Sequence, residues 1–490
     1  MGVAGDGAAP LPPAGRRSAR ARPDAERSLR GRPVRQGRLA ARKHGLRRSP
    51  SPREDAVIIA DRDLFHEWLA KQRDRGGYSV DVVPLSDLDG WTADPVTGNL
   101  RHRTGRFFTV EGVRVETDHA APGTWTQPII DQPESGLLGV LAMLHGGKAH
   151  FLLQAKMEPG NFGTVQVSPT VQATRSNYSR VHQGRAVPYL EWFFPPRGRV
   201  LTDALQTEQG TWVLRKRNRN MIVWVDAAVP VEEGFCWVPE DLVAELLREN
   251  DVINMDARSV LAGWPEPGGA PAEPGGPGSV DLLSWLTDRR THHRLDVTRI
   301  PLAAVEDWTT DGDSIRPVSG NRFSVVGVDV RAGTREVARW SQPLLAPSGQ
   351  GIAAFLVRRT ASGTRVLVRA HTEAGTRDVV ELGPTVQYTP SAHRDAPDPA
   401  EEALIQRVLS ATADRVLYDV VHSEEGGRFH HARNRYLLVE EDEDRPAGTG
   451  VDHRWVDAGL LARMVPLGGQ VNVEARTLLA ALRFGPGLGL

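Results

Sequence analysis

The sequence predicts an α+β fold in which one mixed-sheet module occurs twice, by tandem duplication. Three observations predict it. The chain has 490 residues, which is too long for one ordinary hydrophobic core. Two stretches of the chain match each other residue by residue in the same order. Each stretch opens with a helical pattern and continues with short β-rich runs.

The internal match can be read directly from the residues. The clearest block is Pro-Thr-Val-Gln, at residues 169–172 and again at 384–387. Further matches follow in the same order in both copies: Trp68 with Trp285, Trp91 with Trp308, Trp125 with Trp340, Glu158 with Glu373, Arg217 with Arg433, and Arg258 with Arg476. Because collinear matches over such a span do not arise by chance, we infer a duplication.

The expected elements of the first copy follow in chain order. Asp61 can cap the opening helix. Residues 107–115 alternate between apolar and polar side chains as a strand does, and residues 149–156 resemble a core strand. A helix over residues 239–250 closes the copy.

The second copy repeats this order. Ser279 can cap its opening helix, residues 323–330 alternate as a strand, and residues 365–371 resemble a core strand. A helix is expected over residues 399–413. Mixed sheets with few helices are typical of the α+β class.

These patterns predict four segments: a disordered head over residues 1–55, module 1 over 56–263, a Pro/Gly linker over 264–278, and module 2 over 279–490. Fourteen Lys and Arg but only two acidic residues fall between residues 16 and 53. A head of this composition cannot bury a core. It is either a dispensable leader, which we favour, or an arm that binds nucleic acid or membrane.

Composition excludes several classes of protein. Outside the head, acidic residues outnumber basic ones, which argues against nucleic-acid binding. The single cysteine, Cys236, allows no intramolecular disulfide and favours a cytoplasmic location, and no apolar run is long enough to span a membrane. Neither a dinucleotide fingerprint nor a phosphate loop occurs. The adjacent pairs His292–His293 and His430–His431 suit metal ligation poorly, so we expect no metal and no cofactor.

A dense polar segment over residues 168–182 is the best candidate for a ligand site in the first copy. Arginine can bind a diphosphate with two hydrogen bonds, and hydroxyl and amide groups add further donors. The alternative is an ordinary solvated loop. Its candidate ligand-binding residues are Gln172, Thr174, Arg175, Ser176, Asn177 and Tyr178.

The second copy keeps only part of this segment. Thr385 and Gln387 persist, with Tyr388 beside them, but residues 389–393 replace the polar string of residues 174–178. We therefore expect catalysis in the first copy.

Two further residue types are candidates in both copies. Trp91 and Trp308 belong to the core or cover a sugar or base. Arg217 and Arg433 pair with phosphate or lie on a charged strand face.

Several of these motifs together resemble one known family, the nucleotide-hexose 2,3-dehydratases of actinobacterial deoxysugar pathways. They are Phe-His-Glu-Trp-Leu at 65–69, Trp-Thr-Gln-Pro at 125–128, Gln-Ala-Lys-Met-Glu-Pro-Gly-Asn at 154–161 and Ser-Pro-Thr-Val-Gln-Ala-Thr-Arg-Ser-Asn-Tyr at 168–178. The resemblance covers roughly residues 61–486. It implies two Nudix-like modules that can each hold a nucleotide sugar, only one of them catalytic, in a homodimer without a cofactor.

The resemblance also implies a reaction on a dTDP-sugar, dTDP-4-keto-6-deoxyglucose, in the biosynthesis of a natural product such as an antibiotic. A base removes the C-3 proton, an enolate forms on the C-4 oxygen, and the C-2 hydroxyl leaves as water. The product is a 3,4-diketo-2,6-dideoxyhexose, which a partner 3-ketoreductase would consume. The titratable candidates are Lys156, Glu158, Tyr178 and His182, with their roles unassigned.

Two other functions stay open at this point. A non-catalytic nucleotide-sugar binding protein would use both copies only for binding. An epimerase would form the same enolate without losing water.

Overall fold

The computed structural model describes residues 57–119, 123–174, 186–226, 228–265, 278–320, 322–335, 337–361, 363–388, 399–442 and 450–485. The predicted head lies outside these ranges. So do most residues of the predicted linker and the candidate site residues Arg175, Ser176, Asn177, Tyr178 and His182.

Each copy of the repeat contributes a seven-stranded sheet to the described part of the chain. In the first copy the order is β10–β11–β6–β7–β12, with β8 on β7 and β9 on β6. The strands are β6 (Leu137–His145), β7 (Lys148–Met157), β8 (Val165–Ser168), β9 (Val171–Ala173), β10 (Arg199–Thr207), β11 (Arg217–Trp224) and β12 (Phe235–Pro239). One pair, β11 with β6, is parallel, so the sheet is mixed.

The second copy repeats this order with its own strands, as β22–β23–β18–β19–β24, with β20 on β19 and β21 on β18. The strands are β18 (Gly351–Thr360), β19 (Gly363–His371), β20 (Glu381–Gly383), β21 (Val386–Tyr388), β22 (Val416–Ser423), β23 (Arg433–Glu440) and β24 (His453–Asp457). Again one pair, β18 with β23, is parallel. The predicted duplication and the α+β class are confirmed.

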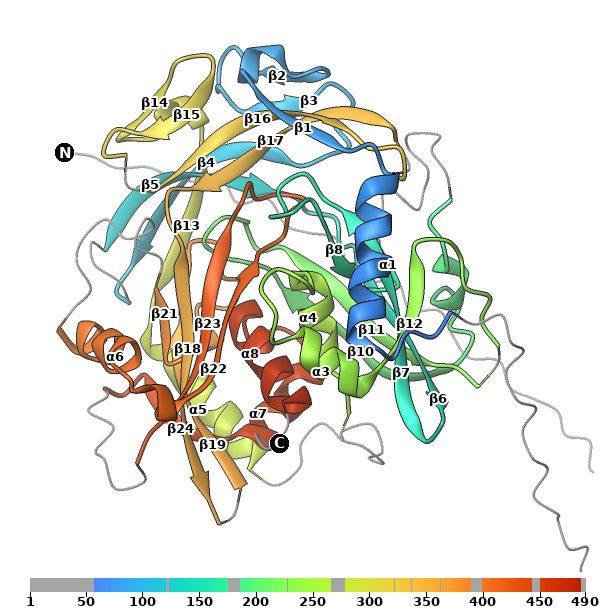
Figure 1. The fold of residues 1–490 in the computed structure, drawn as a ribbon. Helices are drawn as coiled ribbons and strands as arrows, with labels where there is room; N and C mark the ends of the chain where they lie inside the picture. Colours follow the sequence, from blue (N-terminus) through green and yellow to red (C-terminus); the bar gives the residue numbers. More distant parts are fainter. Residues whose placement is uncertain are drawn as a thin grey trace, which may run out of the picture. The chain divides into compact units, whose positions relative to one another are not determined.

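Two five-stranded sheets join the copies by exchanging a strand. The first contains β2 (Trp91–Ala93), β3 (Leu100–His102), β4 (Thr109–Thr117), β5 (Thr124–Asp131) and, from the second copy, β13 (Leu295–Ile300). The other contains β14 (Trp308–Thr310), β15 (Ser314–Pro317), β16 (Phe323–Arg331), β17 (Arg339–Pro347) and, from the first copy, β1 (Ser79–Val83). Figure 1 shows β1 beside β16, where Val80 faces Val330. Each five-stranded sheet therefore contains four strands from one copy and one strand from the other.

The copies also exchange a loop next to the end of a core strand. Gly160 N donates to Gly426 O at 2.7 Å, and in the equivalent place Gly375 N donates to Gly210 O at 2.6 Å. A Cβ on Gly160 would lie 1.7 Å from the carbonyl oxygen of Phe429, so only glycine fits there. This close approach brings the β22–β23 loop of the second copy against the first.

Six of the described helices begin or end the copies: α1 (Arg62–Arg75), α3 (Glu240–Leu246), α4 (Met255–Leu261), α5 (Ser279–His292), α7 (Ala458–Met464) and α8 (Val473–Phe484). A further helix, α6 (Pro399–Leu409), lies between β21 and β22 of the second copy. Helices α4 and α8 pack against each other with almost every side chain buried. None of the described helices has the length and apolar character needed to cross a membrane.

Three local predictions can be compared with these elements. Asp61 caps α1, accepting a hydrogen bond from Leu64 N at 2.9 Å, as predicted. The predicted cap at Ser279 is wrong, because Ser279 is already the first helical residue and Gly278 precedes it in a left-handed conformation. Trp264, the first residue of the predicted linker, is buried in the core, with its ring centre 4.8 Å from that of Phe151.

We expect deletion of residues 1–53 to leave folding and turnover unchanged, since a segment of this composition cannot bury enough apolar surface to order itself. Thermal unfolding and steady-state turnover of the shortened chain, compared with the full chain, test this. A thermal midpoint several degrees lower after deletion would instead show that the head packs on the folded part.

Candidate active site

A cavity of about 410 Å³ lies at the junction of the two copies. The first copy contributes β7, β9 and the start of α4. The second contributes β17 and the β22–β23 loop. Its lining includes Trp91, His102, Lys156, Glu158, Gln172, Thr174, Asp256, Arg335, Trp340, Glu425 and Arg428.

A hydrogen-bonded group of three side chains forms one wall of this cavity. Lys156 Nζ, on β7, donates to Gln172 O at 2.5 Å. Gln172 Nε2, on β9, donates to Glu158 Oε1 at 2.6 Å and thereby orients that carboxylate. Asn254 fixes the amide from the other side, with its Nδ2 3.1 Å from Gln172 Oε1. Glu158 Oε2 is buried with no hydrogen-bond partner among the described residues, so it is available to a ligand.

Two further carboxyl groups next to this wall, those of Asp256 and Glu425, have a raised pKa. Burial, followed by the carboxylates of Glu425, Glu208 and Glu158, raises the pKa of Asp256 well above its usual value. Burial also raises the pKa of Glu425, against the opposing charge of Arg428. Asp256 Oδ1 is buried without a hydrogen-bond partner in the described structure. The cavity therefore combines an oriented carboxylate with carboxyl groups whose pKa is raised, and general acid–base chemistry uses such a difference between neighbouring groups.

Aromatic and basic side chains form the rest of the lining. Trp91 Nε1 donates to Ser341 O at 2.8 Å, which joins the two five-stranded sheets. Trp340 comes from the second copy, and the guanidinium carbon of Arg335 lies 5.8 Å from the centre of its ring. Arg428 stacks 4.5 Å from the Phe108 ring centre. Aromatic faces suit a sugar or base, and arginines suit a diphosphate.

The equivalent place in the second copy is filled differently. Glu373 and Gln387 repeat the carboxylate–amide contact at 3.0 Å, but Thr211 Oγ1 also donates to Glu373 Oε1 at 2.5 Å. Trp212 occupies the loop position in the second site that Arg428 occupies in the first, two residues after the glycine at which the loops cross. Its side chain is buried, 4.7 Å from the Phe429 ring. Glu373 thus accepts a second hydrogen bond from the protein, and the aromatic ring of Trp212 replaces the cation Arg428.

The structure brings five of the predicted residues together at the cavity: Trp91, Lys156, Glu158, Gln172 and Thr174. The predicted string from Arg175 to Tyr178, with His182, lies outside the described residues.

The remaining predicted ligands occupy other places. Thr385 is buried, with its hydroxyl bonded to the backbone of Leu356 and Leu367, and Trp308 packs on Phe323. Arg433 pairs with Asp251 at 2.5 Å. Neither Arg217 nor Tyr388 is among the residues that line the cavity.

Sequence reasoning missed Asp256, Glu425 and Arg428. Asp256 belongs to a segment that recurs with Glu474 in the second copy, and an acidic residue kept in both copies was a signal for it. Glu425 and Arg428 belong to the second copy, and no local pattern shows that their loop reaches the first.

Comparison with known proteins identifies the family of the chain. A family model described as NDP-hexose 2,3-dehydratase matches residues 62–263 and again residues 279–482. A dTDP-4-dehydro-6-deoxy-alpha-D-glucopyranose 2,3-dehydratase of Streptomyces violaceoruber is 48% identical over 442 residues, 88% of this chain and 99% of the relative.

Proteins with the same name from two other organisms are also similar. That of Amycolatopsis orientalis is 45% identical, over 87% of this chain and 91% of the relative. That of Saccharopolyspora spinosa is 41% identical, over 85% of this chain and 90% of the relative. The resemblance inferred from the motifs is confirmed, and the chain belongs to the NDP-hexose 2,3-dehydratase family.

Proposed function

We propose that this chain dehydrates dTDP-4-keto-6-deoxyglucose in the cavity of its first copy, to give a 3,4-diketo-2,6-dideoxyhexose. The names of its relatives support the reaction and the substrate. The observation that carries the location is the pairing of the oriented Glu158 carboxylate with Asp256, whose pKa is raised.

The chemistry divides between these groups. Glu158 Oε2 is placed to take the C-3 proton, whose electrons then move toward the C-4 ketone to form an enolate. Lys156, on the same wall of the cavity as Glu158, would stabilise that oxygen with its positive charge. As the C-2 oxygen bond breaks, Asp256 supplies the proton that turns the leaving hydroxyl into water. The resulting enol carries its hydroxyl on C-3; it takes up a proton at C-2 and releases the hydroxyl proton, which gives the diketone.

Substrate binding is assigned to the remaining lining. Trp91 and Trp340 would cover the sugar or the thymine, and Arg335 and Arg428 would pair with the diphosphate. We extend the assignment to Arg175, Ser176, Asn177 and Tyr178 on sequence grounds, because they directly follow Thr174 at the cavity.

Several wider features belong to the same proposal: Nudix-like modules with the boundaries given above, a homodimer, a cytoplasmic location, a role in natural-product biosynthesis, and a 3-ketoreductase as the next enzyme. The mixed sheets and the single buried Cys236 support the module type and the location.

Incubation with dTDP-4-keto-6-deoxyglucose tests the reaction. A 3-ketoreductase and its hydride donor are added to trap the diketone. In mass spectrometry we expect the trapped product to have the mass of the substrate minus one water plus the two hydrogens added by the reduction. An isomer of unchanged mass would indicate an epimerase. Binding of the sugar without any product would indicate a non-catalytic binding protein.

A further inference from the structure

We infer that this protein binds a divalent transition-metal ion, with Zn²⁺ the best match, at His119, His293 and Asp452. None of the three lines the cavity described above, and the inference goes beyond the proposed function. It replaces the expectation of no metal, which considered only adjacent histidines, because His293 meets residues distant in sequence and His292 takes no part. One nitrogen of each histidine and one oxygen of Asp452 all lie within 4.8 Å of one another. Two imidazoles and a carboxylate are the ligands of many protein zinc sites.

Three separate segments meet at this cluster. His119 follows β4 of the first copy, and His293 follows α5 of the second, just before the exchanged strand β13. These two strands pair with Leu295 opposite Thr117, so both histidines lie at the same end of the pair. Asp452 immediately precedes β24. The two imidazole ring centres are 4.1 Å apart.

The hydrogen bond of His119 fixes which of its nitrogens is available. Its Nε2 lies 2.8 Å from the carbonyl oxygen of Ala370, which can only accept, so Nε2 carries the proton. In the neutral ring Nδ1 then has a lone pair, and it lies 3.9 Å from Asp452 Oδ2. A lone pair and a carboxylate oxygen repel each other. A cation between them would satisfy both.

His293 shows the complementary arrangement. Its Nδ1 lies 3.5 Å from Asp118 Oδ1 and its Nε2 lies 2.8 Å from Asp452 Oδ1, so it has a carboxylate on each side. A proton on Nδ1, held by Asp118, leaves Nε2 to bind an ion that Asp452 also binds. Histidine ligands of metals commonly have such a carboxylate on the second nitrogen.

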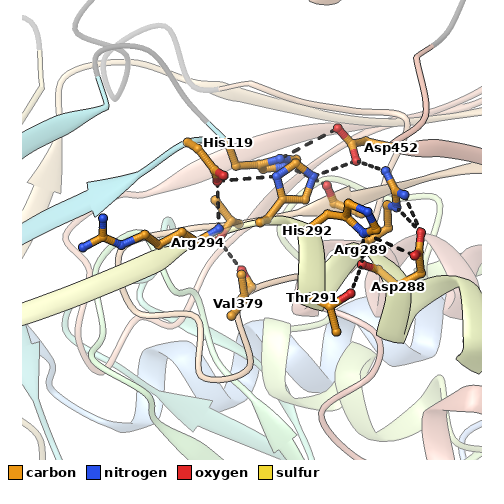
Figure 2. Close-up of polar contacts among 12 residues, drawn as sticks. His119, Asp288, Arg289, Thr291, His292, Arg294, Val379 and Asp452 are labelled. Carbon is orange, nitrogen blue, oxygen red and sulfur yellow. Dashed lines mark hydrogen bonds and ion pairs between the residues drawn. The ribbon is translucent and has the colours of Figure 1, made fainter.

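One competing cation is Arg289, which Figure 2 shows beside Asp452 and Asp288. Arg369 also acts electrostatically on His119, and it pairs with Glu401 at 2.6 Å. Its Nη1 is 3.5 Å from Asp452 Oδ1, whereas its Nε and Nη2 both bond Asp288 on the same helix. Arg289 is therefore held mainly by Asp288, and Asp452 keeps capacity for a second partner.

The duplication provides an internal comparison, because the other copy has an equivalent place, formed by the end of its first helix and the residue before its last large-sheet strand. There Ala155 N donates to Gly234 O at 2.9 Å, as Ala370 N donates to Asp452 O at 2.8 Å. Gly234 thus corresponds to Asp452, and the ends of α1 and α5 make Gly76 correspond to His293. Because Gly234 and Gly76 occupy the positions of Asp452 and His293, the fold does not require the side chains that would bind the metal.

A metal bound here would connect three segments: the end of β4, the start of the exchanged strand β13, and the start of β24 in the large sheet. Its ligands are far apart in sequence, so the ion would close long loops and stabilise the native state by binding it selectively. Three protein ligands leave one position of a tetrahedral site for water.

The test uses full-length protein without a histidine tag, stripped with EDTA and titrated with ZnCl₂ in a calorimeter. We expect one Zn²⁺ per chain and a higher thermal midpoint after addition. Co²⁺ in place of Zn²⁺ should give the visible absorption of a tetrahedral site.

Ligand variants and matched controls locate the ion. His119→Gln and Asp452→Asn should each weaken the site by about 100-fold or more, since even second-shell losses cost 10–100-fold. His292→Gln changes the exposed neighbour of His293, and His430→Gln changes a member of the other histidine pair; both should bind as wild type does. Circular dichroism checks that each variant is folded.

Two results would overturn the inference. One is the absence of stoichiometric Zn²⁺ binding in the wild type, and the other is unchanged binding in folded His119→Gln and Asp452→Asn proteins. The readout is binding and thermal stability, not turnover. A failure of the proposed dehydratase reaction would therefore leave this test intact.

Discussion

Glu158→Gln is expected to lower kcat by about 10³-fold, within the range that removal of a general base usually costs. Glutamine keeps the size of the side chain but has no carboxylate to take the C-3 proton. The hydrogen bond from Gln172 Nε2, at 2.6 Å in the native protein, can still be accepted by the amide oxygen, so the fold should persist. Steady-state kinetics with the coupled 3-ketoreductase measure the change.

The matched control is Glu373→Gln in the second copy. Glu373 also accepts from a glutamine, at 3.0 Å, but Thr211 and His371 contact the same oxygen. Burial acts to raise the pKa of Glu373, yet the hydrogen bonds from His371, Thr211 and Gly210 hold it below its usual value. We expect kcat to change less than about threefold there, because no step of the reaction uses it. A large loss in Glu373→Gln together with full activity in Glu158→Gln would place catalysis in the second copy.

Arg476→Met is expected to lower the free energy of unfolding by about 3–5 kcal/mol, the usual cost of removing a buried charged partner. Arg476 is fully buried on α8. Its guanidinium donates to Val471 O and Thr207 O, each at 2.6 Å, and to Ser259 Oγ at 2.9 Å. Two of these acceptors, Thr207 O and Ser259 Oγ, belong to the other copy, so methionine would remove their hydrogen bonds across the junction.

Denaturant unfolding followed by circular dichroism measures this loss. Arg258→Met makes the symmetric change, because Arg258 Nη2 donates to Ser423 O of the second copy at 2.9 Å. Arg435→Met is the control, since Arg435 and Asp419 form a half-exposed ion pair on adjacent strands and should contribute under about 1 kcal/mol. Equal losses in Arg476→Met and Arg435→Met would show that the buried arginine does not hold the copies together.

Local patterns determined much of this protein. The alternation of residues 323–330 and the cap at Asp61 reflect periodicity and capping, which depend on neighbours in the chain and are visible without tertiary contacts. The duplication, the family and the group of Lys156, Glu158 and Gln172 were also accessible, because the motifs that carry them are contiguous or recur in both copies. The cap assigned to Ser279 was wrong because Ser279 is itself the first residue of that helix and the left-handed Gly278 precedes it.

Only the tertiary structure decided how the copies complete each other. Both exchanged strands, β1 and β13, have ordinary strand patterns that do not specify which sheet they join. Glu425 and Arg428 reach the cavity of the first copy because two loops cross at glycines, where the backbones approach more closely than any side chain permits. Pairing over such sequence distances depends on the packing of the whole core, which no local period encodes. The sequence therefore determined the repeated parts and the candidate residues, and long-range packing decided that residues of both copies line the cavity.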